Sequence, residues 1–512
     1  MTIAIRADSS VNIGSGHVMR CLALAAELSV RGHSILFLCA DYDGHLADLI
    51  TQKGHQVLLL PREQCDVDVG DMAGWLGVGW SLDVEQCQQA LDKVGKLDYL
   101  IVDHYGIDAR WENAMAQYTS YLLVIDDLAN RSHQCDLLLD QTYGRLALDY
   151  FPLLENKNTA LLMGSQFSLL RPDFVAQRDK ALMARSQRKG IQQILITMGG
   201  MDLNNISAEV LNILASVTEQ RWKVKVVLGR GAPHYAELRE SLEKYDFDVE
   251  LLSSVENIAS LMAEADLAIG AAGTTSWERC CLGLPTLLIQ TAGNQKQVVE
   301  GLVDKGAVIF VGEGKSLDRE MMLDALAYAE AHLSDMSDVA SRLCDGYGVQ
   351  RVADYIFLGK NIVLRPVTEL DIELIYQWQS EREARRYSRS TEVPAYDQHV
   401  AWVNRRIKST DPYFIVICND QPVGVLRLDR LDGDNEYELS ILISSRYSGR
   451  GLGTKSLTKL RKLYPSIVIV AEVHEDNLPS HALFKKLGYK QLNGKYYSYS
   501  DHFFIVNHQL DN

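Results

Sequence analysis

The feature that most constrains the fold is a repeated alternation of short apolar runs with longer amphipathic segments. The first such runs span residues 3–7, 34–39, 99–103 and 121–125. The alternation starts again at residue 193 and continues to about residue 289. Buried strands that alternate with helices are typical of parallel α/β sheets. We therefore predict two Rossmann-like lobes, in residues 1–180 and 185–355, with a ligand cleft between them.

The pattern changes after Gly348. A strand-like run and a helix-like run are followed by three successive strand-like runs, then by a glycine-rich loop, a helix, a strand and a last helix. This order is typical of an α+β domain, which we place in residues 361–505. Three domains suit a chain of 512 residues, at roughly 150 residues per domain.

Composition excludes several classes of protein. Lys and Arg total 51 and Asp and Glu total 67, which gives a net charge of −16. Such a chain is a poor binder of nucleic acids or anionic membranes. We see no signal peptide, no apolar stretch of membrane-spanning length and no Cys/His cluster with metal-ligand spacing. We therefore expect a cytoplasmic protein that needs no metal; its oligomeric state is left open.

The first candidate site follows the first strand. Gly14 and Gly16 lie in a loop that opens a helix, where bare backbone amides and the helix dipole favour a bound phosphate. His17 follows directly, and the dipole favours its neutral imidazole, which can accept a proton from water. Arg20 lies on the same helical face and could contact phosphate. A tight turn, a capping histidine and a surface salt bridge remain the alternatives.

Other polar residues follow neighbouring strands of the first lobe. Asp8 ends the first strand, and Tyr105 lies in a DHY triplet after another. Open α/β sheets place ligands at the carboxyl ends of their strands. We therefore include Asp8 and Tyr105 among the candidate catalytic residues.

The second lobe carries a matching set of candidates. Gly273 and Thr274 precede a helix that carries Glu278, whose carboxylate could accept two hydrogen bonds from a ribose diol. Asn294 and Gln295 begin the next helical segment and could bind sugar amides or hydroxyls. Helix capping and solvent exposure are the alternatives for these residues.

These motifs carry a resemblance. The segments RADSSxxIGxGHVMRC (6–21), DHY (103–105), IDDL (125–128), LLRPDF (169–174), MGGMD (198–202) and 270–297 resemble the UDP-sugar hydrolases of pseudaminic acid synthesis. The resemblance implies a glycosyltransferase-B architecture that holds UDP between the lobes. It also implies metal-independent, inverting hydrolysis of UDP-2,4-diacetamido-2,4,6-trideoxy-β-L-altropyranose, with His17 as the base.

A second glycine-rich loop opens a helix in the last domain. It holds Gly449, Gly451 and Gly453 with basic neighbours, and its amides could wrap a pyrophosphate. This domain resembles the GNAT acetyltransferases, which implies acetyl-CoA as cosubstrate. The resemblance extends to a later segment, HEDNLPSHALFKKLGYK. The candidate cofactor-binding residues are Arg446, Gly449, Arg450, Gly451, Gly453, Thr454 and Asn477.

The chemistry of this domain is less defined by the sequence. Phe484 stands where the family often has a tyrosine that protonates the leaving thiolate. Tyr489, Tyr496, Tyr497 or water could serve instead. Glu438, on the strand before the loop, is the candidate base for the attacking amine, with a solvated strand residue as the alternative.

Together the two resemblances predict a bifunctional enzyme. The GNAT domain would acetylate the 4-amino group of a UDP-sugar, and the two lobes would hydrolyse the product. Two alternatives remain. One is a glycosyltransferase-B enzyme that passes the sugar to another acceptor and carries an acyltransferase. The other is a non-catalytic scaffold that binds nucleotide sugars.

Overall fold

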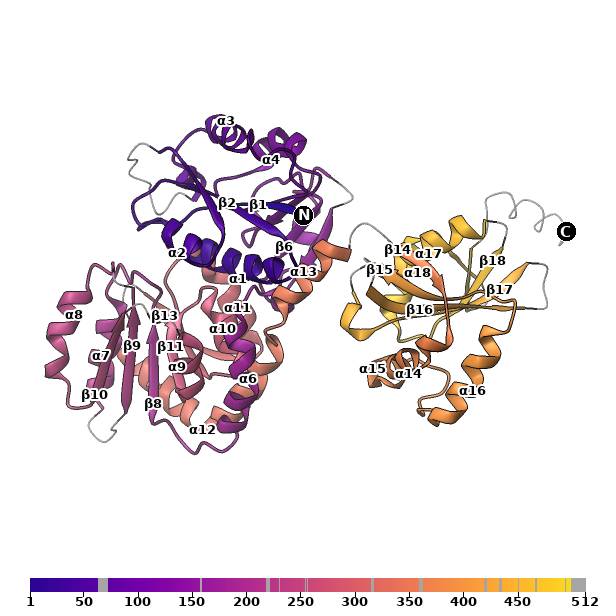
Figure 1. Ribbon diagram of the computed structural model, residues 1–512. Helices are drawn as coiled ribbons and strands as arrows, with labels where there is room; N and C mark the ends of the chain where they lie inside the picture. Colours follow the sequence, from indigo (N-terminus) through magenta and orange to yellow (C-terminus); the bar gives the residue numbers. More distant parts are fainter. Residues whose placement is uncertain are drawn as a thin grey trace. The chain divides into compact units, whose positions relative to one another are not determined.

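The computed structural model describes residues 1–62, 72–156, 159–217, 222–229, 231–253, 255, 257–314, 317–358, 362–418, 421–431, 435–449, 451–465, 467–492 and 494–498. The chain divides into two compact units, Met1–Ala353 and Asp354–Asn512. Figure 1 shows the helices and strands of both units.

The first lobe of the first unit is built on a seven-stranded parallel sheet. Helices α1 and α2 cover one face of it, and α3 and α4 cover the other (Figure 1). In spatial order the strands are β3 (Gln56–Leu60), β2 (Ser34–Ala40), β1 (Thr2–Ala7), β4 (Tyr99–Asp103), β5 (Leu122–Ile125), β6 (Leu137–Asp140) and β7 (Ala160–Met163). The helices are α1 (Gly16–Val30), α2 (Ala47–Gln52), α3 (Trp80–Leu91), α4 (Ala109–Met115) and α5 (Ala147–Tyr150).

The second lobe is built on a six-stranded parallel sheet. Its strands are, in spatial order, β10 (Asp248–Ser253), β9 (Lys223–Leu228), β8 (Gln193–Thr197), β11 (Leu267–Ala271), β12 (Thr286–Gln290) and β13 (Val308–Glu313). Its helices are α6 (Pro172–Arg185), α7 (Ile206–Ala215), α8 (Tyr235–Ser241), α9 (Ile258–Glu264), α10 (Thr275–Cys281), α11 (Lys296–Asp304) and α12 (Arg319–Leu343). Helix α13 (Gly348–Leu358) follows.

In each sheet the first strand of the lobe lies at an interior position: β1 in the first sheet and β8 in the second. Central strands are buried on both faces, and β1 has the burial expected of such a strand because residues 3–7 are all buried. The loops that follow β1 and β4 therefore leave the sheet side by side, at the carboxyl edge where ligands bind. This adjacency brings together residues about 90 positions apart in the chain.

Helix α6 belongs to the second lobe although it precedes that lobe's first strand. Phe174 and Ala181 are buried among residues of α9 and α10. Arg185 donates to the carbonyl oxygens of Leu282, Ala265 and Met262, at 2.9, 2.6 and 2.5 Å. The chain therefore crosses between the lobes at about residue 171, ahead of the boundary that we drew at residue 180.

The second unit is a mixed seven-stranded sheet with helices on both faces. Its strands are, in spatial order, β14 (Ile362–Pro366), β15 (Tyr413–Cys418), β16 (Gln421–Arg430), β17 (Glu436–Ile443), β18 (Val468–Glu472), β20 (Lys495–Tyr497) and β19 (Lys490–Leu492). Its helices are α14 (Ile372–Ser380), α15 (Arg382–Arg385), α16 (Tyr396–Ile407), α17 (Leu452–Leu463) and α18 (Leu478–Lys486).

One strand pair in this sheet is parallel and short. β17 pairs with β18 only from Glu436 to Glu438, opposite Val468 to Val470, although β17 continues to Ile443. The two strands therefore part after three residue pairs, and the rest of β17 has no ladder on that side among the described residues.

Candidate functional site

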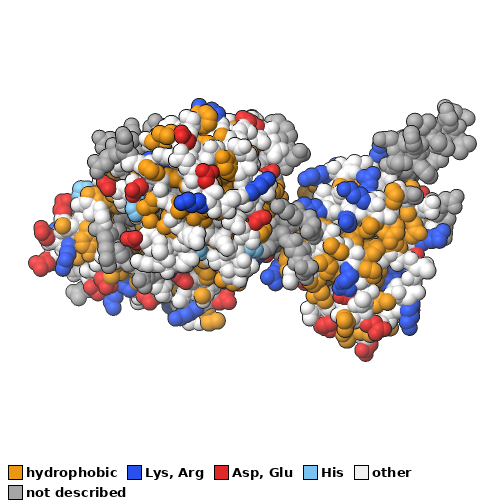
Figure 2. Space-filling view, turned by 45° about the horizontal axis from the view of Figure 1, so that its top comes forward, with side chains coloured by type: hydrophobic (Ala, Val, Ile, Leu, Met, Phe, Trp, Pro, Cys, Tyr) orange, Lys and Arg blue, Asp and Glu red, His pale blue; other side chains and the backbone are white. Residues whose placement is uncertain are grey.

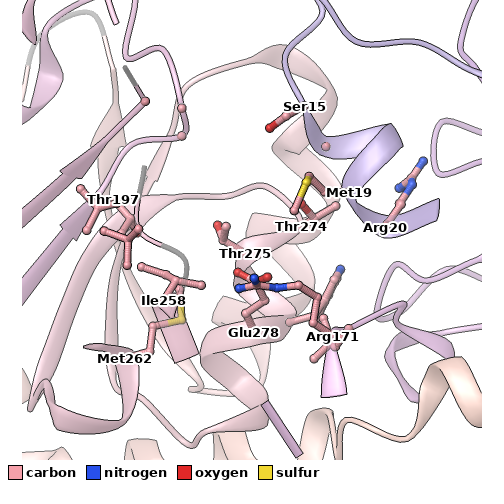
Figure 3. Close-up of a pocket in the computed structure, with 18 of the residues that line it drawn as sticks. Ser15, Met19, Arg20, Arg171, Thr197, Ile258, Met262, Thr274, Thr275 and Glu278 are labelled. Carbon is pink, nitrogen blue, oxygen red and sulfur yellow. The ribbon is translucent and has the colours of Figure 1, made fainter. Parts of the chain in front are cut away.

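A pocket of about 340 Å³ lies between the two lobes of the first unit. Figure 3 shows Ser15, which precedes α1, and Met19 of α1 on one side, and Thr274, Thr275 and Glu278 of the second lobe on the other. A cavity lined by both lobes is what the predicted cleft requires. The lining includes Ser15, Gly16, Met19, Arg20 and Gln141 from the first lobe, and Arg171, Thr197, Gly199, Gly200, Gly229, Ile258, Met262, Thr274, Thr275 and Glu278 from the remainder.

The loop before α1 is a tight turn closed by its own backbone. Gly14 donates its amide to the Ser10 carbonyl at 2.9 Å, and its φ of +81° is in the region that favours glycine. The hydroxyl of Ser10 accepts from the amide of Ile13 at 2.9 Å. Helix α1 then begins at Gly16, which lines the pocket. The arrangement turns the start of a 15-residue helix toward the cavity, where its dipole favours negative charge.

His17 lies in the first turn of α1 and is 8% exposed. Its Nδ1 is 2.6 Å from a carboxylate oxygen of Asp103, the last residue of β4. The ring of Tyr105 lies edge-on to the imidazole, with centroids 4.5 Å apart, and Trp75 lies 6.2 Å away. The sequence places Asp103, in the DHY triplet, near the same crevice but does not pair it with His17, and nothing in the sequence singles out Trp75.

Arg20 lines the pocket, but its guanidinium is held by the first lobe. It donates to both oxygens of Asp103 at 2.6 Å and to Asp127 at 2.9 Å. Tyr105 donates its hydroxyl to the other oxygen of Asp127 at 2.5 Å. Arg20 thus serves first as a partner of two carboxylates, and the phosphate contact that we expected would have to be shared with them.

Asp8 lies under the site rather than in its wall. It is fully buried, 2.5 Å from the Arg6 guanidinium, and accepts from the Ala40 amide at 2.7 Å. Its other oxygen lies 3.1 Å from Nε2 of His104. Burial alone would raise the pKa of Asp8, but the charge of Arg6 holds that pKa well below its ordinary value. This placement favours a structural role over proton transfer.

The second-lobe wall combines hydroxyl groups, glycines and one carboxyl group. Thr274 and Thr275 lie at the start of α10, and Glu278 follows one turn later. Burial raises the pKa of Glu278 to about 7, while the positive charge of Arg171 acts in the opposite direction. Gly273 directly precedes these residues.

Two of the loops that line the pocket contact each other. The Gly229 amide donates to the Gly200 carbonyl at 2.7 Å. A Cβ atom on Gly229 would lie 2.5 Å from that oxygen, so no larger residue fits there. No local sequence pattern singles out Gly229.

Asn294 and Gln295 do not line this pocket. Asn294 is exposed. The amide oxygen of Gln295 accepts from the Thr291 backbone amide at 2.8 Å, and its amide nitrogen donates to the Thr291 hydroxyl at 3.0 Å. The side chain of Gln295 therefore closes its own loop.

In the second unit, a glycine-rich segment directly precedes α17. Gly449 and Gly451 have φ of +75° and +69°, and a Cβ atom on either would meet no described atom within 4 Å. Glycine is thus required at Gly449 and Gly451 by the backbone rather than by packing, just ahead of α17. Gly453 packs closer, 3.3 Å from Leu483. Figure 2 shows Lys and Arg side chains gathered on the visible face of this unit, which suits an anionic ligand.

The remaining candidate cofactor-binding residues differ in the contacts that their side chains and backbones make. The Arg446 guanidinium lies 5.5 Å from the ring centroid of Tyr447. Thr454 lies in the first turn of α17, where its carbonyl accepts from Thr458. Asn477 caps α18 by accepting from the Ser480 amide at 3.2 Å. Arg450 lies outside the described residues.

Glu438 lies at the point where β17 and β18 part. Its carboxylate accepts from the Arg389 guanidinium at 2.5 Å, and the same nitrogen donates to Glu472 of β18 at 2.8 Å. These contacts with Arg389 lower the pKa of Glu472. To act as a base, Glu438 would first have to separate from Arg389, so that its carboxylate can contact the incoming amine.

The tyrosines offered as alternative acids also have defined surroundings. Tyr496 is fully buried, and its hydroxyl lies 2.8 Å from Nδ1 of His481. The Tyr496 ring stacks on Phe484 with centroids 5.3 Å apart. Burial raises the pKa of Tyr489 to about 12. Tyr497 lies on β20.

Among the residues that the structure describes, no group of three His, Cys, Asp or Glu side chains is arranged to hold a metal ion. None of the helices in that part of the chain has the length and apolar character needed to cross a membrane.

Fold and site together define the class: a two-lobed region of glycosyltransferase-B type followed by a GNAT domain. Residues 193–325 match the glycosyltransferase family 28 C-terminal domain, and residues 361–490 match the acetyltransferase (GNAT) domain. The crystal structure of Acinetobacter baumannii MurG superposes with a TM-score of 0.50 at 14% identity, covering 69% of this chain and 99% of MurG. The predicted fold class is confirmed.

Curated relatives define the chain more closely. The UDP-2,4-diacetamido-2,4,6-trideoxy-beta-L-altropyranose hydrolase of Campylobacter jejuni is 26% identical over 308 residues, 60% of this chain and 97% of that protein. An uncharacterised protein of Methanocaldococcus jannaschii is 24% identical over 505 residues, 96% of this chain and 97% of that protein. The chain is therefore a fusion of a hydrolase-like region with a GNAT domain, as the resemblance indicated, and a GNAT domain implies the use of acetyl-CoA.

Proposed function

We propose that this chain carries out two consecutive reactions on one nucleotide sugar. The GNAT unit acetylates the 4-amino group of a UDP-sugar. The two-lobed unit then hydrolyses UDP-2,4-diacetamido-2,4,6-trideoxy-β-L-altropyranose to UDP and the free sugar. The similarity to the Campylobacter jejuni hydrolase supports the second reaction, and the GNAT domain supports the first.

The observation that carries the hydrolase proposal is the placement of His17. Residues on both sides of it, Gly16 and Arg20, line the pocket between the lobes, and its ring is held by a buried carboxylate. In the proposed step, His17 takes a proton from water as the water oxygen bonds to the anomeric carbon. The bond from that carbon to the phosphate oxygen breaks, and its electron pair leaves with UDP. The start of α1 stabilises the charge that develops on the diphosphate.

The second lobe supplies the groups for nucleotide binding. We propose that Glu278 accepts hydrogen bonds from the ribose diol and that the backbone and hydroxyl groups of Thr274 and Thr275 contact the diphosphate. Gly273 leaves room for the approach of the ligand. Asn294 and Gln295 would need a rearranged loop to reach it.

In the GNAT unit, Gly449, Gly451 and Gly453 would hold the diphosphate of acetyl-CoA at the start of α17. The open edge of β17 would hold its extended arm. When bound, acetyl-CoA supplies an acetyl group activated as a thioester. Glu438 would accept the proton of the attacking amine after its carboxylate has separated from Arg389.

The experiment follows both steps in one tube. The full chain is incubated with acetyl-CoA and the UDP-4-amino sugar, and the products are followed by NMR. We expect CoA, UDP and the free diacetamido sugar. With His17→Ala the reaction should stop at the acetylated UDP-sugar.

Other outcomes would favour other functions. Little free sugar unless an acceptor is added would point to a glycosyltransferase with an attached acyltransferase. Binding of the UDP-sugar without turnover would point to a scaffold. Acetylation of a protein amine in place of the sugar would remove the first reaction from the proposal.

A further inference from the structure

We infer that Asp103 is the positioning residue of the hydrolase: it holds His17 in the one tautomer that can accept a proton from water, and Arg20 holds Asp103. This inference rests on the proposed role of His17 as the base.

The position of Asp103 is fixed by the sheet. It is the last residue of β4, which lies between β1 and β5, and it is fully buried. Its Oδ1 lies 2.6 Å from Nδ1 of His17. Its two oxygens accept from Nε and Nη2 of Arg20, each at 2.6 Å, and the thiol of Cys21 lies 3.4 Å from Oδ2. A carboxylate fixed by a two-pronged guanidinium has little freedom to rotate.

This contact determines which nitrogen of His17 carries the proton. A carboxylate only accepts hydrogen bonds, so an imidazole nitrogen at 2.6 Å must donate. Nδ1 is then protonated, and in the neutral ring the lone pair lies on Nε2. The charge of Arg20 keeps Asp103 ionised: burial acts to raise the pKa of Asp103, but Arg20 and His17 hold it well below its ordinary value.

The surroundings also fix the plane of the ring. Tyr105 meets the imidazole edge-on at an interplanar angle of 84°, and Trp75 does the same from 6.2 Å. Tyr105 is in turn tied to Asp127, which also accepts from Arg20. Nδ1 lies 2.6 Å from Asp103 and 3.3 Å from Nη2 of Arg20. These contacts and the two aromatic rings hold the imidazole in one orientation, and Nε2 is the nitrogen left to accept a proton from water.

The test compares Asp103→Asn with a matched control in the full chain. The first lobe holds a second buried pair of the same kind, in which Nδ1 of His133 lies 2.7 Å from Glu112. Glu112→Gln removes a buried His–carboxylate contact of nearly the same length without touching His17. We expect Asp103→Asn to lower kcat for hydrolysis by about 10²- to 10⁴-fold, with KM for the UDP-sugar changed by less than about threefold. Glu112→Gln should lower the melting temperature and leave kcat near that of the unsubstituted chain.

Two further arms separate positioning from stability. Asp103→Glu keeps the charge and should recover part of the lost kcat. Adding Asp103→Asn to His17→Ala should slow hydrolysis no further, because a positioning residue acts only through the residue it positions. If the double variant hydrolysed the UDP-sugar more slowly than His17→Ala by the same factor that Asp103→Asn alone causes, the inference would be overturned.

A measurement on the unsubstituted chain covers the case in which Asp103→Asn fails to fold. ¹⁵N NMR of histidine-labelled protein, with the His17 signal assigned by its absence in His17→Ala, reports the tautomer directly. We expect neutral His17 to carry its proton on Nδ1; a proton on Nε2 would overturn the inference. Full hydrolysis by His17→Ala would instead remove the proposed function, whereas an inactive His17→Ala with a fully active Asp103→Asn would remove only the role of Asp103.

Discussion

Glu278 shows how one partly buried side chain can make ligand binding depend on pH. Burial raises the pKa of its carboxyl group to about 7, so its charge changes between pH 6 and 8. A ribose diol donates to the ionised carboxylate better than to the neutral acid. We expect the affinity for the UDP-sugar to rise roughly tenfold from pH 6 to 8. Calorimetry with the His17→Ala chain measures this without turnover.

The control for this prediction is Glu278→Gln in the same His17→Ala background. The amide does not titrate, so affinity should be lower at pH 8 and nearly constant across the range. An unchanged slope with glutamine at this position would assign the pH dependence to another group.

His133 makes a prediction about stability rather than binding. Burial lowers its pKa, but hydrogen bonds and charges from Asp126 and Glu112 outweigh burial and raise the pKa from 6.5 to about 9. A group with a raised folded-state pKa stabilises fully below its unfolded pKa, near 6.5, and loses that contribution as pH rises through 9. His133→Gln should therefore cost about 3 kcal/mol more at pH 6 than at pH 10.

Denaturant unfolding at the two pH values, monitored in the first unit, measures this difference. Equal costs at both pH values would show that His133 contributes through packing alone.

At the same scale, the sequence predicts side chains better than their partners. His17 was found because a glycine-rich turn and a helix start identify it locally. Asp103 was not assigned to it because 86 residues separate the two, and only the order of strands brings β1 next to β4. Arg20 was expected to face phosphate, but two strand-end carboxylates hold it. Asn294 and Gln295 follow a strand as binding residues do, yet Gln295 is used by its own loop.

At the scale of elements, the loop before α17 makes the most specific prediction. Gly451 has a left-handed backbone and open surroundings, whereas Gly453 has no such backbone and a flexible side chain nearby. Gly451→Val should strain the loop by about 1–2 kcal/mol or more and fill the space over its amides. We expect acetylation to be lost and hydrolysis to remain.

Gly453→Ala is the milder comparison, because its added carbon meets only the end of Leu483. It should weaken acetyl-CoA binding less than Gly451→Val, as measured by calorimetry. The reverse order would show that the backbone conformation at Gly451 is not what the cosubstrate needs.

Alternating apolar runs predicted the elements and the class of both parallel sheets. Their order in space was not predictable in this way, because period and length do not identify neighbours. The boundary drawn at residue 180 divides α6 for a related reason: the apolar face of this helix fits either lobe, whereas Phe174 is buried in the core of the second. Nothing in the sequence of residues 436–443 predicts that β17 pairs with β18 over only three residues.

At the scale of the whole molecule, the two proposed reactions belong to separate compact units. A His17→Ala chain should acetylate only, and a Gly451→Val chain should hydrolyse only. Mixed together, the two full-length chains should yield free sugar, because the intermediate can diffuse from one to the other. Coupled NMR measurement of the intermediate and the free sugar checks this.

A lag in the mixture that is absent from the unsubstituted chain would indicate direct transfer of the intermediate within one molecule. No free sugar from the mixture, although each chain retains its own step, would contradict independent sites.

The walls of the pocket come from two lobes whose apolar cores are formed by different residues. A nucleotide sugar that touches Gly16 on one wall and Thr275 on the other acts as a cross-link between two independently packed bodies. Its binding energy therefore also opposes their separation. Saturating ligand should merge any two-step melting of residues 1–353 into one transition, because the bound substrate couples the unfolding of one lobe to that of the other.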